Sequence, residues 1–398
     1  MSAAIKRGLC VAPLLAVGLV LPGPALCQDF PDPGRDMNES FETVANFPKP
    51  DGIKVAGDED DEEGKGSDLI IVPIPKSSPS LGFGITLVGS LFYNPNNSPE
   101  PWITGIGLMR TTNGSQAAGV MHKMSLANDK FRMTALAAYA DINVDFFGIG
   151  PGAGERGRSI ELNEKGLAVI LQGQTRLFDH VYAGPRLLYI DISTSINRQD
   201  RDPLFPDAEI PTAAFDTTLG KLGLVLSYDH RDNSLEPKNG AYVTAAYMFS
   251  LPELGSDFSN DKFTMAANVY RMISTNTVIA GRVSYCGVST GGPFYDLCLY
   301  GMSSDLRGYE TGRYRDRGFW ASQVELRHHL GGRWGAVAFA GVGESMPTPT
   351  DFGDGEFLPA VGAGLRWRPS PETSINMRLD FAYGKDTKAV YLSLGEAF

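Results

Sequence analysis

The chain has 398 residues, of which 46 are Gly and 10% are aromatic, and its formal net charge is −11. This acidic balance argues against a nucleic-acid-binding protein, which needs a basic surface for the phosphate backbone. An apolar fraction of 42% is enough for a folded body, and a composition rich in Gly and aromatics with few Cys is typical of large β-sheet proteins.

The first 27 residues are expected to be an export signal. Lys6 and Arg7 supply the positive start, and the uncharged apolar stretch 9–21 follows. This stretch is too short to cross a bilayer as a helix, so cleavage near Gln28 is predicted. The alternatives are a retained anchor and a lipid-modified Cys27, although the residue before Cys27 fits a lipobox poorly.

Residues 28–68 are predicted to form a disordered acidic tail on the periplasmic side. Several Pro residues punctuate the segment, and its acidic run from Asp58 to Glu63 repels itself. A calcium site is the alternative reading of this run. It is disfavoured because the acids are contiguous and lack the spacing of a coordinating loop.

From residue 69 onward, segments of roughly ten residues alternate between apolar and polar side chains and are separated by turn residues, as in membrane barrel strands. No later stretch is long and apolar enough for a membrane helix, so a membrane location would require a closed barrel. Sixteen strands are predicted, at 81–93, 102–111, 116–125, 130–140, 142–148, 164–176, 181–195, 216–229, 240–250, 262–271, 277–286, 319–330, 334–343, 358–368, 374–383 and 389–398.

The connections between these strands alternate in length, which a barrel explains and a soluble sandwich does not. The long connections, expected outside the cell, are 149–163, 196–215, 251–261, 287–318 and 344–357. Short turns, expected in the periplasm, include 112–115, 177–180, 272–276, 331–333 and 369–373. The exceptions are a short outer connection at 126–129 and a longer inner turn at 230–239. The prediction is an all-β fold, a 16-stranded antiparallel transmembrane β-barrel spanning 69–398 in the bacterial outer membrane.

Two Cys, Cys286 and Cys298, stay in the mature chain once the signal has taken Cys10 and Cys27 with it. An even pair in an exported protein indicates a disulfide that closes a short loop. Two free thiols are the alternative.

The longest outer connection carries Leu306-Arg307-Gly308-Tyr309, and Glu325 follows on the next strand. This pattern resembles the barrel of the BamA/TamA superfamily of outer-membrane assembly and transport factors, also called bacterial surface antigens. In that family the loop folds back into the lumen, and its Arg pairs with acids on the inner wall. The resemblance therefore implies that these five residues lock the loop inside the barrel, with an exposed surface loop as the alternative.

The chemistry of the motif fits such a lock. Arg307 is a planar, permanent cation suited to a bidentate pair with a carboxylate. Gly308 allows a sharp turn, and Tyr309 is able to pack on the wall. Without such contacts a loop of about thirty residues is costly to order.

Other parts of the resemblance are more diffuse. Asp229, Arg231, Asp232 and Gly240 look like the family's mid-barrel turn. The final Phe398 looks like the terminal aromatic that the outer-membrane assembly machinery reads, and it is expected in the interfacial girdle. The segments 71–75 and 81–84 look like the family's entry into the first strand.

Two departures from the family pattern stand out. Gly341 occupies a position where family members often carry Asp, so Arg307 is expected to depend more heavily on Glu325. Only about forty residues lie between the signal and the barrel, where the family's assembly factors carry POTRA domains. The resemblance therefore implies a short member without POTRA domains.

No enzymatic, metal or cofactor site is expected. His328 and His329 are adjacent in a strand and point to opposite faces, which disfavours a metal site. No nucleophile elbow, P-loop or paired C-x-x-C occurs. A lipid hydrolase with a Ser–His pair on the outer wall is an alternative, but no such grouping stands out. Arg378 and Asp380 are expected to form ion pairs in the lumen that line or tune a pore.

The resemblance implies a role in outer-membrane assembly or in polypeptide or lipid transport, with a seam between the first and last strands that opens. A passive porin-like channel and a structural surface antigen are the alternatives. The expected partners are outer-membrane lipid, nascent outer-membrane proteins or lipid cargo, and the assembly machinery during the protein's own insertion. Nucleic acid is not an expected partner.

Overall fold

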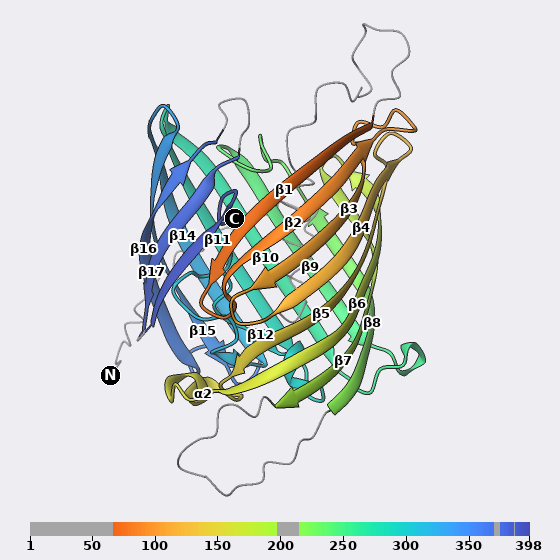
Figure 1. Cartoon of the computed structure of the whole chain (residues 1–398), viewed down its shortest axis with the longest axis vertical. Coiled ribbons are helices and arrows are strands. Elements are labelled where there is room, and N and C mark those ends of the chain that lie inside the picture. Colours follow the sequence, from red (N-terminus) through yellow and green to blue (C-terminus); the bar gives the residue numbers. More distant parts are fainter. Residues whose placement is uncertain (1–66, 197–214, 370–374, 386) are drawn as a thin grey trace, which may run out of the picture.

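The computed structural model describes residues 67–196, 215–369, 375–385 and 387–398. Within them, sixteen antiparallel strands close into a barrel, in which the first strand, β1, meets the last strand, β18, at a seam (Figure 1). The predicted 16-stranded antiparallel barrel is confirmed. The predictions of the export signal and of almost all of the acidic tail lie outside the described residues.

The barrel strands are β1 (Ser67–Ser78), β2 (Gly82–Tyr93), β3 (Trp102–Thr111), β4 (Gln116–Leu126), β5 (Phe131–Phe146), β6 (Ile160–Phe178), β7 (Val181–Ile196), β8 (Phe215–Tyr228), β9 (Gly240–Ser250), β10 (Asp261–Ser274), β11 (Thr277–Val288), β14 (Gly318–Gly331), β15 (Trp334–Met346), β16 (Glu356–Trp367), β17 (Met377–Gly384) and β18 (Thr387–Leu394). The connections hold five short elements, α2 (Pro151–Glu155), η1 (Pro252–Leu254), η2 (Phe294–Asp296), β12 (Cys298–Leu299) and β13 (Arg315–Asp316). None of the helices in the described ranges is long and apolar enough to cross a membrane.

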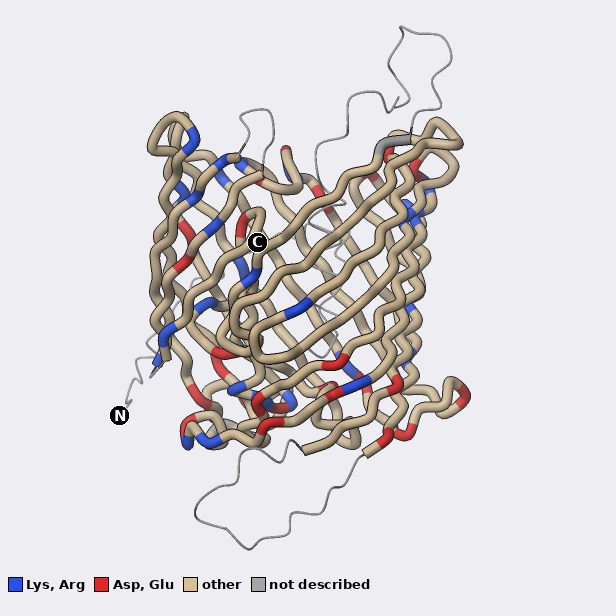
Figure 2. Tube along the Cα trace, in the orientation of Figure 1, with Lys and Arg blue, Asp and Glu red and all other residues tan. Residues whose placement is uncertain are grey.

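Alternation along the strands places apolar side chains on the outside of the wall. In β2, for example, Phe83, Ile85 and Leu87 are 54%, 51% and 43% exposed, whereas Val88 and Phe92, which point inward, are buried. Charged residues lie mostly toward the two ends of the barrel and in its interior, and the front strands show long uncharged stretches (Figure 2). A soluble monomer rarely exposes an apolar surface of this extent, so the belt is suited to contact lipid.

The strand count is right because two differences cancel: one strand of the barrel is not among those predicted, and two predicted strands form a single one. The first strand, β1, was missed because Pro73 and Pro75 interrupt it. Proline is tolerated in a strand whose edge is largely unpaired, and β1 pairs with β18 at a single position. The predicted strands 130–140 and 142–148 form one continuous strand, β5.

The division at Asp141 is wrong because β5 continues beyond the apolar belt. Asp141 lies on the outer face of the wall, where Asn163 of β6 donates a hydrogen bond to it at 2.7 Å and the Lys165 ammonium lies 3.4 Å away. Asp141 therefore marks the place where β5 and β6 leave the lipid. It does not mark the end of a strand.

The missed first strand also reverses the ends assigned to the first connections. With β1 included, 94–101 and 127–130 lie at the end with the short turns, and 112–115 lies at the end with the long connections. The exceptional short outer connection at 126–129 thus belongs to the short-turn end. From 147–159 onward the assigned ends are unchanged, and the longest connections lie at the lower end in Figure 1.

Candidate functional site

The connection between β11 and β14, residues 289–317, fills part of the barrel interior, and we call it the lumen loop. Its residues Tyr300, Leu306, Arg307, Tyr309 and Tyr314 are at most 1% exposed. Four of them pack in one apolar cluster with residues of β11, β14 and β16. A long connection that buries its largest side chains against the wall is an ordered part of the protein.

Arg307 is the centre of the contacts between the lumen loop and the wall. The structure brings it together with Glu325 of β14, to which its Nη2 donates. Its Nη1 donates to Asp380 of β17 at 2.6 Å, and its Nε donates to Gln323 at 3.2 Å. The guanidinium carbon also lies 3.5 Å from the ring centre of Phe339. A fully buried cation is thus paired with two carboxylates and stacked on an aromatic face.

These contacts belong to a closed circuit of alternating charges, which we call the charge ring. Its members, in order around the circuit, are Arg307, Glu325, Arg327, Glu396, Arg366 and Asp380. The Arg327 and Glu325 side chains meet at 2.6 Å, Arg366 lies 2.7 Å from Glu396, and Arg366 lies 2.6 Å from Asp380. The longest step, between Arg327 and Glu396, is 3.8 Å. The ring joins the lumen loop to three wall strands and to the segment after β18.

The expectation that Arg307 depends mainly on Glu325 is wrong, because Asp380 supplies a second acid from β17. The position of Gly341 is filled from the loop. A Cβ on Gly341 would lie 2.4 Å from Cδ1 of Leu306, which leaves no room for an Asp side chain. Gly364 makes room in the same way, since a Cβ there would lie 1.9 Å from Oδ1 of Asp380. Small residues in the wall thus admit the loop and the ring.

The Gly308-Tyr309 pair holds the loop against the β17–β18 hairpin. Gly308 has φ +120°, and its N–H donates to the Tyr391 hydroxyl of β18 at 3.1 Å. That hydroxyl in turn donates to the Tyr309 carbonyl at 3.1 Å, and the Tyr309 hydroxyl donates to the Pro359 carbonyl at 2.6 Å. Thr387, the first residue of β18, donates to the Gly308 carbonyl. The loop therefore contacts the strand that forms one side of the seam.

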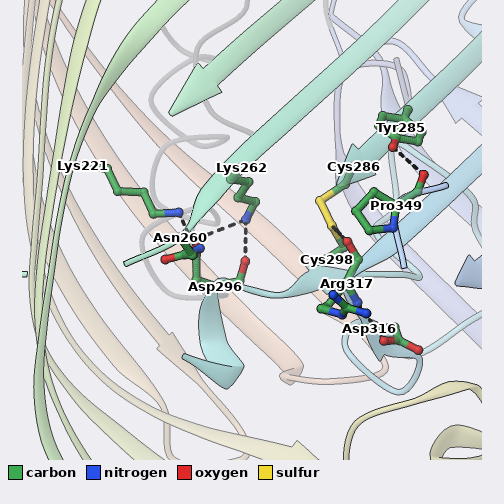
Figure 3. Close-up of a disulfide and its surroundings, with 10 residues drawn as sticks. All are labelled: Lys221, Asn260, Lys262, Tyr285, Cys286, Asp296, Cys298, Asp316, Arg317 and Pro349. Atoms are coloured by element: carbon green, nitrogen blue, oxygen red, sulfur yellow. Dashed lines mark hydrogen bonds and ion pairs between the residues drawn. A yellow bond between two sulfur atoms is a disulfide. The ribbon is translucent and has the colours of Figure 1, made fainter. Parts of the chain in front are cut away.

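A second anchor lies at the other end of the lumen loop, around Asp296. Two wall lysines surround its carboxylate, Lys221 of β8 at 2.5 Å and Lys262 of β10 at 3.5 Å, and Asn260 donates to it at 2.7 Å (Figure 3). Burial opposes ionisation of Asp296, but the two lysines hold its pKa below the usual range. Sequence reasoning missed this anchor, although both lysines lie in predicted strands or at their ends.

The predicted disulfide between Cys286 and Cys298 is confirmed and lies beside this anchor (Figure 3). It joins the wall strand β11 to β12 of the lumen loop, and the two Cys are 12 positions apart in the sequence. Asp305 of the loop adds a further ion pair, at 2.7 Å from Arg282 of β11. The loop is therefore fixed by a covalent bond and by buried ion pairs along its length.

The predicted turn motif forms a compact turn between β8 and β9, apart from the charge ring. The Arg231 Nε donates to Asp229 at 2.8 Å, and Asp232 accepts backbone N–H groups from Lys238 and Asn239. Gly240 has φ +110°, and a Cβ there would lie 2.0 Å from the His230 carbonyl oxygen. Close backbone approach therefore requires glycine at this position.

Phe398 lies elsewhere than expected. The strand β18 ends at Leu394, and Gly395, with φ +80°, turns the chain inward. Glu396 then enters the charge ring, and the Phe398 ring lies 5.5 Å from the Arg327 guanidinium, whose Nη2 donates to the Phe398 carbonyl. Contacts with Arg327 and Arg366 therefore hold the final segment inside the barrel, away from the lipid-facing girdle.

The seam between β1 and β18 is the weakest join of the barrel. Only one residue pair, Ser77 with Leu392, is in register there. The next shortest register in the described barrel, between β8 and β9, has six pairs, and β1 pairs with β2 along its whole length. Missing ladder hydrogen bonds make this edge the one that separates most easily.

The half of the barrel opposite the charge ring is hollow at the short-turn end. A cavity of about 510 Å³ lies there, lined by residues of β3–β7, of β9 and of the turns at this end. Its charges are balanced, four Lys or Arg against four acids: Lys123, Arg132, Arg176, Arg231, Glu100, Asp129, Asp179 and Asp229.

Comparison with known proteins relates this barrel to one protein family and to solved structures of similar fold. Residues 125–398 match the model of the Omp85 superfamily domain. The fold is similar to that of BamA from Haemophilus ducreyi lacking POTRA domains 1-3 (TM-score 0.58, 14% identity), covering 90% of this chain and 77% of that one. It is also similar to CdiB from Escherichia coli (TM-score 0.57, 12% identity), with 90% and 70% of the two chains covered. No curated protein matches the sequence. At these identities the structural likeness is one of fold.

Proposed function

Because the chain belongs to the Omp85 superfamily and forms an outer-membrane barrel of that type, we propose that it works as an assembly or transport factor. In this proposal the barrel inserts or passes polypeptide or lipid at the outer membrane through its seam. Omp85 members are non-enzymatic barrels, so in this proposal the barrel moves its cargo without covalent chemistry. Nascent outer-membrane proteins or lipid are the proposed cargo.

The single register pair at the seam is the observation that carries this proposal. Every backbone N–H and C=O in lipid needs a partner, so a stable wall requires full ladders on both sides of each strand. The edges of β1 and β18 leave most of their ladder positions free for another strand. A guest strand that pairs with these edges would satisfy them and would replace only the single pair between Ser77 and Leu392.

The charge ring supports the proposal because it connects the lumen loop with the seam strand. Glu396 follows β18 directly, and Tyr391 of β18 holds the Gly308-Tyr309 backbone. Separation of β18 from β1 therefore does not require the loop to leave its site, since these contacts lie on the β18 side. The lumen loop and the last strands can therefore remain together as one unit while β1 separates from β18.

A disulfide across the seam tests this function. Ser77 and Leu392 are directly opposed, so the variant Ser77→Cys with Leu392→Cys is suited to bridge the two strands. In liposomes we expect the oxidised variant to lose insertion of a nascent barrel substrate, and reductant to restore it. The matched control is Leu87→Cys with Leu108→Cys, an opposed and outward-facing pair between β2 and β3. Because both proteins keep the native disulfide, reduction of that bond affects them equally.

Full insertion activity in the oxidised seam variant would exclude the seam as the working element. A passive channel is then the second candidate, which the hollow half of the lumen favours. A channel predicts steady ion conductance that is the same in the oxidised and reduced seam variant. Conductance measured in planar bilayers, beside the insertion assay, separates the two functions.

A further inference from the structure

A second cavity, of about 150 Å³, opens at the short-turn end, and we call it the basic cavity. It is lined by the ends of β10, β11, β14, β15 and β16 and by nearby turns, and its volume is well above the roughly 10–15 Å³ that one water molecule needs. Its charged lining residues are Lys238, Arg327, Arg333, Arg366, Arg368, Glu236 and Glu396. The neighbouring cavity of about 510 Å³ has equal numbers of cations and acids. An excess of cations therefore distinguishes the basic cavity.

This excess remains after the ion pairs around the cavity are taken into account. The charge ring, which supplies part of the lining, is neutral because it contains three Arg and three acids. Outside the ring, Arg368 is paired with Glu236. Lys238 and Arg333 form no ion pair with any residue that the structure describes, and the Arg333 Nη1 donates to the Pro369 carbonyl. Two positive charges of the basic cavity are therefore uncompensated.

The basic cavity is also lined by arginines whose donors lack acceptors. Nη1 of Arg327, Nη2 of Arg366 and Nε of Arg368 are buried and donate no hydrogen bond to a described residue. The Arg327 and Arg366 side chains are only 9% and 5% exposed. Nη2 of Arg366 lies 4.0 Å from Glu325, which is too long for a hydrogen bond. Because a buried charged donor without an acceptor is costly, an anion that supplied acceptors here would be stabilised.

The number and arrangement of these donors favour a phosphate group over a carboxylate. The three arginines come from β14, from β16 and from the segment after β16, so their donors belong to separate parts of the wall. A carboxylate offers two oxygens, whereas a phosphate monoester offers three strong acceptor oxygens and a charge of about −1.5 to −2 at pH 7. Its charge matches the two uncompensated cations, and guanidinium groups are well suited to phosphate geometry.

We propose that the basic cavity binds a phosphate group, either inorganic phosphate or a phosphate monoester. A soluble phosphate compound reaches the cavity from the aqueous mouth of the barrel. The headgroup of a lipid is the other source, because the lining includes Trp334, which is half exposed, and Trp is typical of the level of lipid headgroups. Both sources present the same chemistry to the arginines. The proposal concerns binding alone and does not rest on the proposed function.

Calorimetric titration of the full chain in maltoside detergent, which contains no phosphate, tests this binding. The first probe is inorganic phosphate, with the ionic strength held constant by sodium chloride so that general screening does not change. The second probe is short-chain phosphatidic acid, a lipid phosphate monoester, in the same micelles. We expect saturable binding to one site. Binding of inorganic phosphate identifies a soluble phosphate compound as sufficient, and binding of phosphatidic acid alone identifies a lipid headgroup as the ligand.

Variants at the opening of the cavity show whether the binding occurs there. Arg333→Gln with Arg368→Gln should weaken phosphate binding about tenfold or more, because charge-assisted hydrogen bonds are lost. Both residues lie outside the charge ring, so the barrel should fold. The matched control is Lys123→Gln with Arg176→Gln in the cavity of about 510 Å³, which removes the same charge and should leave the affinity unchanged. Arg327→Lys keeps the charge at the inner end but removes the unpartnered Nη1, and it should also weaken binding.

Three outcomes would overturn the proposal. In the first, neither phosphate probe binds more tightly than chloride, which means that water alone satisfies the arginine donors. In the second, the Arg333 and Arg368 double variant keeps the affinity of the unmodified chain or loses no more than the matched control. In the third, sodium acetate binds more tightly than phosphate, so the cavity holds a carboxylate. None of these measurements scores insertion activity, so a failure here is distinguishable from a failure of the proposed function.

Discussion

The two halves of the barrel interior differ in how they accommodate inward-facing charged side chains. On the β14–β18 side, the lumen loop fills the interior, and the charge ring pairs the loop's buried Arg307 with two carboxylates. On the β3–β9 side, the interior at the short-turn end stays hollow, and its ion pairs sit at the edge of a cavity. Wall strands of similar alternation thus enclose a packed region and a hollow one.

Burial, not charge content, sets how much an ion pair contributes to the stability of this barrel. The Arg307 side chain and both of its acidic partners are 0% exposed, whereas Arg132 and Asp129 on the hollow side are 28% and 9% exposed. Removing one partner of a buried pair leaves a charge that water cannot reach, while a partly exposed pair is replaced by solvent.

Arg307→Ala is expected to be the most damaging single change. It leaves Glu325 and Asp380 without their shared cation, which costs about 3–5 kcal/mol for a broken buried pair. The free energy of unfolding, measured by urea titration of the folded barrel in detergent micelles, should fall by that amount. If the variant does not fold at all, Arg307→Lys serves as a milder version that keeps the charge and loses the bidentate geometry.

The matched control on the hollow side is Arg132→Ala, which removes an Arg from an Arg–Asp pair of similar length, 2.5 Å. Its expected loss is about 0–1 kcal/mol, because solvent replaces the partner of a partly exposed pair. Equal losses for the two variants would contradict the contrast between the packed and hollow sides.

Removal of the disulfide, by Cys286→Ser with Cys298→Ser, is expected to have the next largest effect. A bridge that closes a loop of about 15 residues contributes on the order of 3 kcal/mol by restricting the unfolded chain. The loop should stay in place in the folded state, because Asp296 keeps its two lysines. Urea titration should show lower stability, and limited proteolysis should leave 289–317 uncut. Rapid cleavage there would mean that the ion pairs cannot hold the loop alone.

Gly341→Asp tests whether the wall glycine makes room for the loop. The new side chain would introduce a family-like acid, but its Cβ would lie 2.4 Å from Cδ1 of Leu306. Overpacking of this kind costs about 1–3 kcal/mol. Adding Leu306→Ala to the same protein should recover part of that loss, measured as a double-mutant cycle in urea. A stabilising effect of Gly341→Asp alone would show that the missing acid, not the space, limits the site.

Much of the wall was predictable from the sequence because lipid imposes a simple rule. Every second side chain must be apolar along a membrane strand, so alternation located most strands from β2 to β18. The rule did not hold where a strand extends beyond the lipid, or where prolines occur within a strand. Asp141 lies beyond the apolar belt, and Pro73 and Pro75 disguise β1.

The candidate site was predictable only in part, because its members come together across the barrel interior. Arg307 and Glu325 lie within one loop and the strand that follows it, and the family resemblance of this short motif associated them. Asp380 and Glu396 are 73 and 89 positions beyond Arg307 in the numbering. Their meeting depends on strand order, on the inward turn at Gly395 and on the direction taken by the loop. A single sequence carries no direct signal for these three features.

The smallest expected effect is a pH dependence at the border between the packed loop and the β5 side. Burial, together with the nearby Asp145 carboxylate, raises the pKa of Glu310 in the lumen loop to about 7. Between the unfolded value of about 4.3 and pH 7 the folded state therefore binds more protons than the unfolded state, so stability falls as pH rises through this window. Because Glu310 is only partly buried, the expected loss is about 1 kcal/mol. Glu310→Gln should flatten urea-derived stability between pH 5 and 7, whereas Glu253→Gln, on an exposed residue of η1, should leave the slope unchanged. If the unfolding free energy of Glu310→Gln still falls between pH 5 and 7, the titrating group is another residue.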